Sequence, residues 1–376
     1  MERDWEAWAE AHSEEQCQLL RELGRIPAPT RQEERRAAFC RDWLLAQGAR
    51  DVIIDGAKNV ICPIGPREGE LTVFAAHTDV VFPDTEPLPL REENGRLYAP
   101  GIGDDSANLV NLLMGTKYLL QSGTPLRRGL LAVANACEEG LGNLDGTKAL
   151  FAAYGDRIGA FYSFDCHMGQ CVEAAVGSHR WRVLCRTRGG HSYSDFGRPN
   201  AIEILCRLVE RLYAQQLPEE AKTTFNVGRF EGGSTVNSIA QEASLLYEFR
   251  SVSQACLERM EESFRRILED CRGRDWSLET ELLGVRPGSG PVDPERLRAM
   301  TAASCAAIRA YCGDPLDLSP RSTDSNVPLS MGIPANTLGT VRGGLSHTRE
   351  EWIELSSLTP GLKIALRLML EAANRA

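Results

Sequence analysis

The chain has 376 residues, of which 43% are hydrophobic and 25% are charged, a composition typical of globular proteins and not of disordered or collagen-like ones. The net charge of −10 argues against a nucleic-acid partner, because binding a phosphate backbone requires a concentrated basic face. No apolar run reaches the roughly 18 residues of a membrane span, and the charged N-terminal stretch lacks the apolar core of a secretory signal.

The twelve cysteines are scattered along the chain and form no Cys-x-x-Cys pair. This spacing argues against thiolate zinc sites and against thioredoxin-like redox chemistry. We interpret the cysteines as small buried hydrophobic side chains in a reducing compartment. Together with the absence of a secretory signal, this interpretation predicts a cytoplasmic protein.

The N-terminal half of the chain predicts strands that alternate with helices. Helical apolar spacing over 4–23 predicts a first helix, and Thr30-Arg31-Gln32-Glu33 has the form of a capping box that opens a second helix, 30–47. The next predicted elements are strands at 52–54, 59–64 and 71–76, a helix at 106–120, and strands at 130–136 and 159–164. This alternation predicts a mixed or parallel sheet that is covered on both faces.

The pattern changes near Gly177 to a compact β-α-β-β-α-β unit of about 105 residues with a four-stranded antiparallel sheet. Its predicted elements are strands at 180–186, 225–230, 243–250 and 277–283 and helices at 199–214 and 254–271. A Pro/Gly-rich stretch, 285–291, suits a hinge. After it, the alternation of helices and strands of the N-terminal half returns. The predicted elements are helices at 294–311 and 359–372 and short strands around 333–338. We therefore predict one discontinuous α/β domain, residues 1–177 and 286–376, interrupted by an inserted α+β domain, residues 178–285.

Side chains that bind metals follow two of the predicted strands. The strand at 71–76 ends in His77-Thr78-Asp79, and the strand at 159–164 is followed by Asp165. In open α/β sheets, sites lie at the carboxyl ends of the strands. His77 could bind a metal while Asp79 holds its other ring nitrogen. A surface histidine beside a turn aspartate explains His77 and Asp79 equally well.

Two loops add further candidates. Asp104 offers a carboxylate in Gly101-Ile102-Gly103-Asp104-Asp105, where glycines permit a tight turn at the start of a helix. Helix capping by either aspartate is the plainer explanation of this segment taken alone. His347 lies in a glycine-containing loop at 343–352.

Adjacent carboxylates, Glu138 and Glu139, follow the apolar strand at 130–136. Because adjacent residues point in different directions, one could bind a metal while the other acts as a general base. The alternative is an exposed acidic turn. Taken together, the segments supply two imidazoles and three carboxylate ligands, which suit two zinc ions, since zinc accepts nitrogen and oxygen ligands. A bridging carboxylate would hold two metals about 3.5–4 Å apart.

In this order and at these separations, the five segments resemble the aminoacylase/glutamate carboxypeptidase/peptidase T family of co-catalytic zinc hydrolases, which includes relatives of acetylornithine deacetylase and succinyl-diaminopimelate desuccinylase. The resemblance covers nearly the whole chain. It implies a mixed-sheet, zinc-exopeptidase-like catalytic domain of the α/β class, with the inserted βαββαβ domain as a lid and dimerisation domain.

The resemblance also implies a role for each candidate. His77 and Asp165 would be the terminal ligands of one zinc ion, and Glu139 and His347 those of the other. Asp104 would bridge the two ions. Asp79 would orient His77, and Glu138 would be the general base that takes a proton from water and passes it to the leaving amine.

Three residues of the inserted domain resemble functional positions of the family. His191, in Gly189-Gly190-His191-Ser192, resembles the lid histidine that in dimeric members reaches the partner's active site and stabilises the oxyanion. Asn237 and Arg250 resemble positions that hold the substrate carboxylate, which a guanidinium fork fits. A turn histidine and a strand-end charge are the alternatives. The other histidines considered, His12, His167 and His179, we take as non-catalytic, although His167 could compete as a ligand.

The chain departs from the family at one point. Many members follow the bridging aspartate with Asp-Lys-Gly, whereas this chain has Asp105-Ser106-Ala107, so that a lysine at the start of the helix is missing.

We expect metal-dependent hydrolysis of an amide bond in a small peptide, by an exopeptidase or a di- or tripeptidase with two divalent ions. Zinc is the first choice of metal, with manganese or cobalt as alternatives. An N-acyl amino acid deacylase of the acetylornithine deacetylase or aminoacylase type is the alternative function, followed by a non-catalytic binding or dimerisation homologue. The expected partners are the small substrate and a second copy, in a homodimer formed through the inserted domain, and neither nucleic acid nor a membrane.

Overall fold

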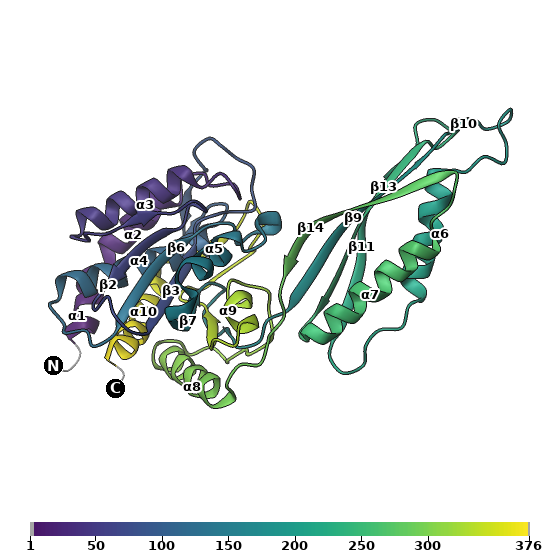
Figure 1. Ribbon diagram of the computed structural model, residues 1–376. Coiled ribbons are helices and arrows are strands. Elements are labelled where there is room, and N and C mark those ends of the chain that lie inside the picture. Colours follow the sequence, from purple (N-terminus) through teal and green to yellow (C-terminus); the bar gives the residue numbers. More distant parts are fainter. Residues whose placement is uncertain (1–3, 375–376) are drawn as a thin grey trace. The chain divides into compact units, whose positions relative to one another are not determined.

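A computed structural model of the chain describes residues 4–374. The chain divides into two compact units (Figure 1): one contains the residues up to Ala175 and those from Pro291 onward, and the other is Val176–Gly290. The predicted domain limits, after residues 177 and 285, differ from these bounds by two and five residues. The predicted α/β fold class, with a central mixed sheet, is confirmed.

The first unit is built on a seven-stranded sheet in the order β1-β2-β6-β3-β7-β15-β8. The strands are β1 (Ile53–Ile54), β2 (Val60–Ile64), β3 (Leu71–His77), β6 (Gly129–Asn135), β7 (Ile158–Phe164), β8 (Cys171–Val172) and β15 (Ala335–Leu338). The four central strands β6, β3, β7 and β15 run parallel, whereas β2 and β8 are antiparallel to their neighbours. Every residue of β3 and β6 is buried, as expected for strands covered on both faces.

Helices cover both faces of this sheet. Phe74 and Ala76 of β3 belong to the apolar cluster on one face, and Val73 and Ala75 belong to the cluster on the other, because successive side chains of a strand alternate. The first face packs against α1 (Asp4–Ala11), α2 (Ser13–Leu23), α3 (Glu34–Ala46), α4 (Ala107–Gln121), α8 (Pro294–Tyr311) and α10 (Leu358–Asn374). The second face packs against α5 (Asp145–Tyr154) and α9 (Asn326–Ser330).

The N-terminal helices differ from the prediction. The expected helix at 4–23 is two helices, and α3 begins at Glu34 rather than at Thr30. The predicted capping box is wrong, because the Thr30 hydroxyl donates a hydrogen bond to Asp79 Oδ2 (2.9 Å) and Arg31 has a left-handed φ of 73°. The Thr30 side chain therefore binds Asp79, at the edge of the sheet, and does not cap a helix.

Helix α5 and a small second sheet were not predicted. Gly146 and Thr147 weaken the helical pattern of α5, yet Gly146 is required, because a Cβ there would lie 2.1 Å from the carbonyl oxygen of Ala136. The small sheet, in the order β16-β17-β5-β4, consists of strands too short to show a periodic pattern. They are β4 (Arg91–Glu93), β5 (Arg96–Tyr98), β16 (Gly343–Gly344) and β17 (Trp352–Glu354).

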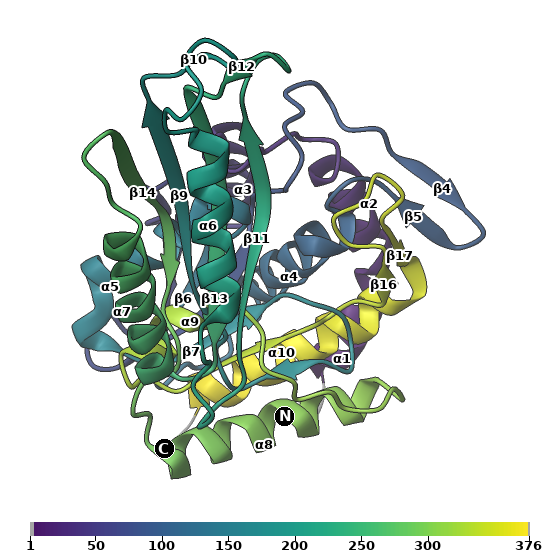
Figure 2. The ribbon, with the colours of Figure 1, turned by 90° about the vertical axis from the view of Figure 1, so that its right-hand side faces the viewer.

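The second unit has the predicted β-α-β-β-α-β order and a four-stranded antiparallel sheet, β11-β13-β9-β14. Its strands are β9 (Gly177–Thr187), β11 (Thr223–Gly232), β13 (Glu242–Ser251) and β14 (Trp276–Arg286). Helices α6 (Ala201–Ala214) and α7 (Gln254–Asp270) lie side by side on one face of this sheet (Figure 2). A short pair, β10 (Gly190–His191) and β12 (Ser238–Ile239), continues beyond one end.

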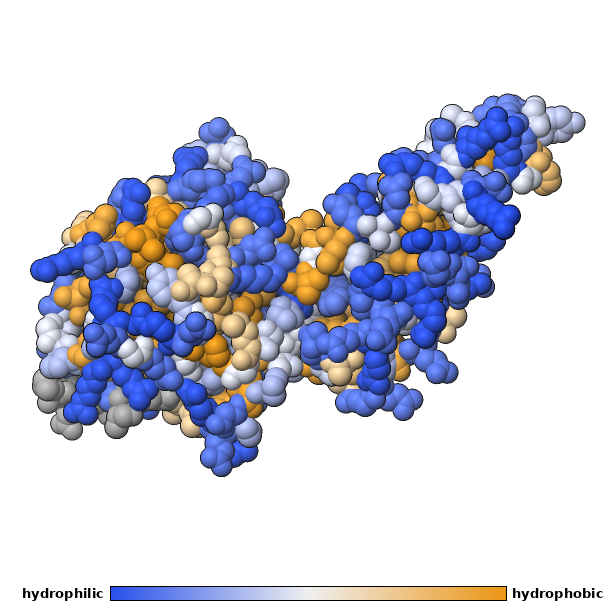
Figure 3. Space-filling model, in the orientation of Figure 1, coloured by the Kyte–Doolittle hydropathy of each residue, from blue (hydrophilic) through white to orange (hydrophobic). Residues whose placement is uncertain are grey.

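None of the helices among residues 4–374 is long and apolar enough to cross a membrane. Figure 3 shows hydrophilic residues over most of the displayed face of each unit.

Candidate metal centre

The carboxyl ends of the parallel strands bring three of the predicted segments to one edge of the sheet. His77 ends β3 and pairs in register with Asn135, which ends β6 and is followed closely by Glu138 and Glu139. Asp165 follows directly after β7, the other parallel neighbour of β3. Because parallel strands end at the same edge, side chains far apart in the sequence meet there.

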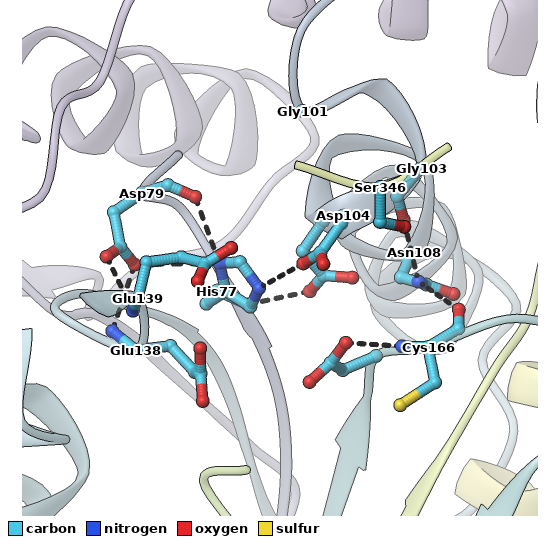
Figure 4. Close-up of polar contacts among 12 residues, drawn as sticks. His77, Asp79, Gly101, Gly103, Asp104, Asn108, Glu138, Glu139, Cys166 and Ser346 are labelled. Carbon is cyan, nitrogen blue, oxygen red and sulfur yellow. Dashed lines mark hydrogen bonds and ion pairs between the residues drawn. The ribbon is translucent and has the colours of Figure 1, made fainter. Parts of the chain in front are cut away.

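Asp104 occupies the centre of the cluster. It lies in a π-helical turn, Ile102–Ser106, that precedes α4. Its Oδ1 is 2.9 Å from His77 Nε2, and its Oδ2 is 3.3 Å from His347 Nε2 (Figure 4 shows the contact between His77 and Asp104). His347 Nε2 is also 3.0 Å from Glu139 Oε1. One carboxylate therefore faces two imidazoles with its two oxygens, as a bridging ligand would.

Two groups of ligand atoms fit a metal ion. The ligand atoms of His77, Asp104 and Glu139 all lie within 4.8 Å of one another, and those of His77, Asp105 and Asp165 do the same. The structure thus brings all five predicted metal ligands into contact or into a shared group. Asp105, which the sequence did not single out, joins the second group, and its Oδ2 accepts a hydrogen bond from the backbone N–H of His77 (2.8 Å).

The charges of the cluster also fit divalent cations. Asp105, Glu138, Glu139 and Asp165 are all buried, and such a concentration of buried carboxylates is costly unless cations compensate it. Asp105 Oδ1 is a buried oxygen without a hydrogen bond. Imidazole and carboxylate donors together suit zinc and neighbouring divalent ions.

Burial shifts the titration of these groups. Desolvation raises the pKa of Glu139 to about 7, and it also raises the pKa of Asp165. Asp104 is different: burial opposes its ionisation, but hydrogen bonds with His347 and His77 outweigh burial and lower its pKa. The same contacts with Asp104 and Glu139 raise the pKa of His347 to about 11. In the metal-free protein, the proposed ligands Glu139, Asp165 and His347 therefore bind protons more tightly than such groups ordinarily do.

We expect metal binding at pH 7 to release protons from His347 and Glu139. A ligating imidazole is neutral and a ligating carboxylate is ionised, whereas the raised pKa values of about 11 and about 7 keep protons on these groups in the metal-free protein. The release should shrink, and the metal affinity should rise, as the pH increases from 7 toward 11. Calorimetric titration in two buffers with different ionisation enthalpies measures the released protons. Release of no protons at pH 7 would contradict the assignment of His347 and Glu139 as metal ligands. His347→Ala should lower the number of protons released.

Asp79 holds the carboxylate pair at the end of β6 more directly than it holds His77. Its Oδ1 accepts a hydrogen bond from the Glu138 N–H (3.0 Å), and its Oδ2 accepts hydrogen bonds from the Glu139 N–H (2.9 Å) and from Thr30 (2.9 Å). His77 Nδ1 is 3.0 Å from the Asp79 backbone oxygen but 3.5 Å from the Asp79 carboxylate. The backbone of Asp79 thus orients His77, while its side chain fixes Glu138 and Glu139.

Asp79→Asn is expected to disturb this arrangement. The amide nitrogen would face the N–H of either Glu138 or Glu139, and a buried donor that loses its acceptor costs about 1–3 kcal/mol. We therefore expect the free energy of unfolding to fall by about that amount in urea denaturation, with a lower kcat in hydrolysis assays. Asp156→Asn, at an exposed position, is the matched control. Wild-type stability and kcat in Asp79→Asn would refute this role.

Buried Arg36 of α3 supplies a positive charge near the site. Its Nη1 donates hydrogen bonds to the Thr78 carbonyl (2.9 Å) and to the Ser106 hydroxyl (3.2 Å). Burial lowers its pKa to about 10, so it stays protonated at neutral pH, and the carboxylates of Asp79 and Asp105 favour that charge. Ser106 thus contacts a guanidinium from another helix. The contact joins residues 70 positions apart, so no local pattern could reveal it.

Asp324 is another buried carboxylate that the sequence did not reveal. Its Oδ2 accepts a hydrogen bond from Asn135 Nδ2 (2.5 Å) and its Oδ1 accepts one from Thr147 (2.5 Å). Burial, together with the nearby charge of Glu138, raises its pKa to about 7. It lies in an irregular segment just before α9, where no helix or strand pattern marks it.

The structure brings together two of the three candidate residues of the second unit. The Ser192 N–H donates a hydrogen bond to the Asn237 carbonyl (3.0 Å), which places Asn237 next to the exposed His191. Arg250, in contrast, donates from Nε and Nη2 to the Glu248 carboxylate (both 3.0 Å).

Arg250 lies near the end of β13 opposite to these two residues. The eight steps of strand from Glu242 to Arg250 span about 27 Å at about 3.4 Å per step. Arg250 and Asn237 of one chain therefore cannot hold the same small carboxylate.

Comparison with known proteins finds relatives by sequence and by fold. The model of the "Peptidase family M20/M25/M40" matches residues 73–371. The "Uncharacterized protein YqjE" of Bacillus subtilis is 27% identical over 340 residues, which cover 86% of this chain and 87% of that protein. A succinyl-diaminopimelate desuccinylase of Bordetella petrii is 28% identical over 325 residues, covering 81% of this chain and 83% of its own.

Among solved structures, a tripeptidase of Staphylococcus aureus superposes with a TM-score of 0.77 at 22% identity, covering 96% of this chain and 99% of its own. This likeness concerns the fold. The family match extends over most of the chain, including the inserted unit and the segments that carry His77, Asp104, Glu139, Asp165 and His347. The chain thus belongs to the peptidase family M20/M25/M40 and is a hydrolase of the metallopeptidase and amidohydrolase class.

Proposed function

We propose that this protein is an exopeptidase that hydrolyses the terminal amide bond of a di- or tripeptide with two zinc ions. The observation that carries the proposal is the position of Asp104, whose two carboxylate oxygens face His77 and His347 beside the Glu138-Glu139 pair. The tripeptidase name of the structural neighbour is the reason for placing peptides first among amide substrates.

The ligands fall into two sets around Asp104. His77 and Asp165 would hold one ion, and Glu139 and His347 would hold the other, with Asp104 between them. Bound there, the ions would supply the Lewis acidity that amide hydrolysis needs. The grouping of His77 with Asp165 and the 3.0 Å approach of His347 to Glu139 support this division.

Glu138 is the proposed general base. Its side chain is buried beside that of Glu139, and its backbone N–H is held by Asp79 Oδ1. A carboxylate in this position can take a proton from the attacking water and return it to the nitrogen of the leaving amine. Glu138 and Glu139 thus divide the work: the first moves protons and the second holds a metal.

The second unit would complete the site in a homodimer. His191 and Asn237 are neighbours and His191 is exposed, as a pair that enters a partner's site must be. We propose that His191 donates a hydrogen bond to the oxyanion in the partner subunit and that Asn237 contacts the substrate there. Arg250 stays a proposed substrate contact on the basis of the resemblance, at a different place from Asn237.

A deacylase of N-acyl amino acids is the second candidate, supported by the 28% identity with a protein named succinyl-diaminopimelate desuccinylase. The test is a panel of dipeptides, tripeptides, and N-acetyl and N-succinyl amino acids, assayed with zinc, manganese or cobalt. We expect kcat/KM for the best peptide to exceed that for the best N-acyl amino acid by at least about tenfold, which corresponds to 1.4 kcal/mol. The reverse order would identify a deacylase. No hydrolysis with any of the three metals would favour a non-catalytic homologue.

A further inference from the structure

Glu351 is a buried carboxylate that the proposed reaction does not use directly. Its side chain is 1% exposed, although glutamate is among the residues that are seldom fully buried. Its Oε1 accepts hydrogen bonds from the backbone N–H groups of Gly103 (2.8 Å) and Asp104 (2.8 Å), and its Oε2 accepts one from that of Gly101 (3.1 Å). One side chain therefore binds the backbone of the turn that carries Asp104.

The backbone of Glu351 and Trp352 also forms hydrogen bonds with the segment just before this turn. The Glu351 carbonyl accepts a hydrogen bond from the Ala99 N–H (3.1 Å), and Trp352 pairs with Tyr98 in the ladder of β17 and β5. Glu351 is thus fixed by its backbone on one side of the turn and by its carboxylate on the other.

The turn accepts this carboxylate because of its glycines. A Cβ at Gly103 would lie 3.2 Å from Glu351 Oε1, a tight approach. Gly101 has a left-handed φ of 71°, and a Cβ there would lie 2.3 Å from a methyl carbon of Val80. Besides permitting the tight turn that the sequence suggested, these glycines allow close packing of the turn against Val80 and the Glu351 carboxylate.

His347 precedes Glu351 by four residues in a folded turn. The Thr348 N–H donates a hydrogen bond to the Leu345 carbonyl (3.1 Å), and the Glu351 N–H donates one to the Thr348 carbonyl (3.3 Å). His347 itself has a left-handed φ of 64°. The turn returns the imidazole to Asp104, with 3.3 Å between His347 Nε2 and Asp104 Oδ2.

We propose that Glu351 is a positioning residue that sets the separation between Asp104 and His347, two ligands of the same metal ion. Three links form a closed ring. Four residues of chain connect His347 to Glu351, the Glu351 carboxylate accepts a hydrogen bond from the Asp104 N–H, and the Asp104 carboxylate contacts His347. Because backbone N–H groups occupy both oxygens of Glu351, it acts through Asp104 and is not itself a ligand. The inference rests on the ligand assignment of the proposed function, but not on the identity of the substrate.

The test compares Glu351→Gln with Glu350→Gln, an adjacent and exposed control whose ion pair with Arg91 is 3.3 Å long. Glutamine has nearly the same shape, but its amide nitrogen would face one of the three backbone N–H groups. Cobalt is titrated into the metal-free proteins, and the visible absorption spectrum reports the coordination of each ion. We expect Glu351→Gln to weaken the binding of at least one ion by about 10- to 100-fold and to change the spectrum, as loss of a ligand's support does. Glu350→Gln should match the wild type.

Thermal unfolding of the metal-free proteins separates positioning from general support of the fold. Cobalt affinity and spectrum like those of the wild type in Glu351→Gln would overturn the proposal, whether or not the melting temperature falls. Failure of the peptide panel with normal cobalt binding would instead refute the proposed substrate and leave the role of Glu351 intact. A wild-type protein that binds less than one cobalt ion would overturn both.

Discussion

Glu138→Gln is expected to slow turnover at least about 100-fold while both metal ions stay bound. Glutamine keeps the size of the side chain but cannot accept a proton from water, and positioned general bases contribute about 10²- to 10⁴-fold to the rate. We therefore expect kcat for the best peptide to fall at least about 100-fold, with metal content per chain unchanged by elemental analysis. The backbone N–H of Glu138 would still donate to Asp79, so the local fold should persist.

The outcome that would contradict this assignment is loss of metal from Glu138→Gln. It would mean that Glu138 is the ligand and Glu139 the base. Wild-type turnover in the variant would show that neither the proton transfer nor the reaction depends on this carboxylate.

Glu139→Ala is expected to lose one metal ion and, with it, nearly all activity. Glu139 Oε1 is 3.0 Å from His347 Nε2 and within 4.8 Å of the ligand atoms of His77 and Asp104, so its removal takes away a donor at the centre of the cluster. Loss of a residue that only supports a ligand costs about 10- to 100-fold in affinity, so loss of the ligand itself should cost more than about 100-fold. Metal content after dialysis against a weak chelator measures the effect.

Glu138→Ala is the matched control, because it removes an adjacent carboxylate of the same length. It should retain two ions under the conditions in which Glu139→Ala retains about one. Equal metal content in the two variants would contradict the division of labour between the two residues.

The sequence predicted the parts of the site that follow from strand ends. His77, Asp165 and the pair Glu138-Glu139 come directly or closely after apolar strands, and parallel pairing of those strands brings them to one edge. The same periodic patterns predicted the β-α-β-β-α-β order of the second unit. Local pattern sufficed where regular strands carried the functional residues.

Contacts between distant irregular segments could not be predicted. The local sequence predicts Thr30 as part of a helix cap, yet its hydroxyl donates a hydrogen bond to Asp79, 49 positions away. Glu351 binds the backbone of Gly101 across 250 positions, and it does so from a loop without periodicity. No propensity in either segment encodes its partner, because the partner is set by the packing of the whole unit.

The length of β13 separates Arg250 from Asn237. A family resemblance can suggest that Asn237 and Arg250 serve one substrate, but only the strand register shows that they lie near opposite ends of β13. The resemblance therefore located candidate residues, while the structure decided which of them can act together within one chain.

Titration of the metal-free protein with zinc, followed by the hydrolysis rate of the best peptide, tests the central claim most directly. The account predicts no hydrolysis without metal, a rise up to two equivalents of zinc per chain, and a rise at least about 100-fold smaller in Glu138→Gln. Hydrolysis by the metal-free protein at the rate of the zinc-loaded protein would contradict the claim that the Asp104 cluster is the hydrolytic centre.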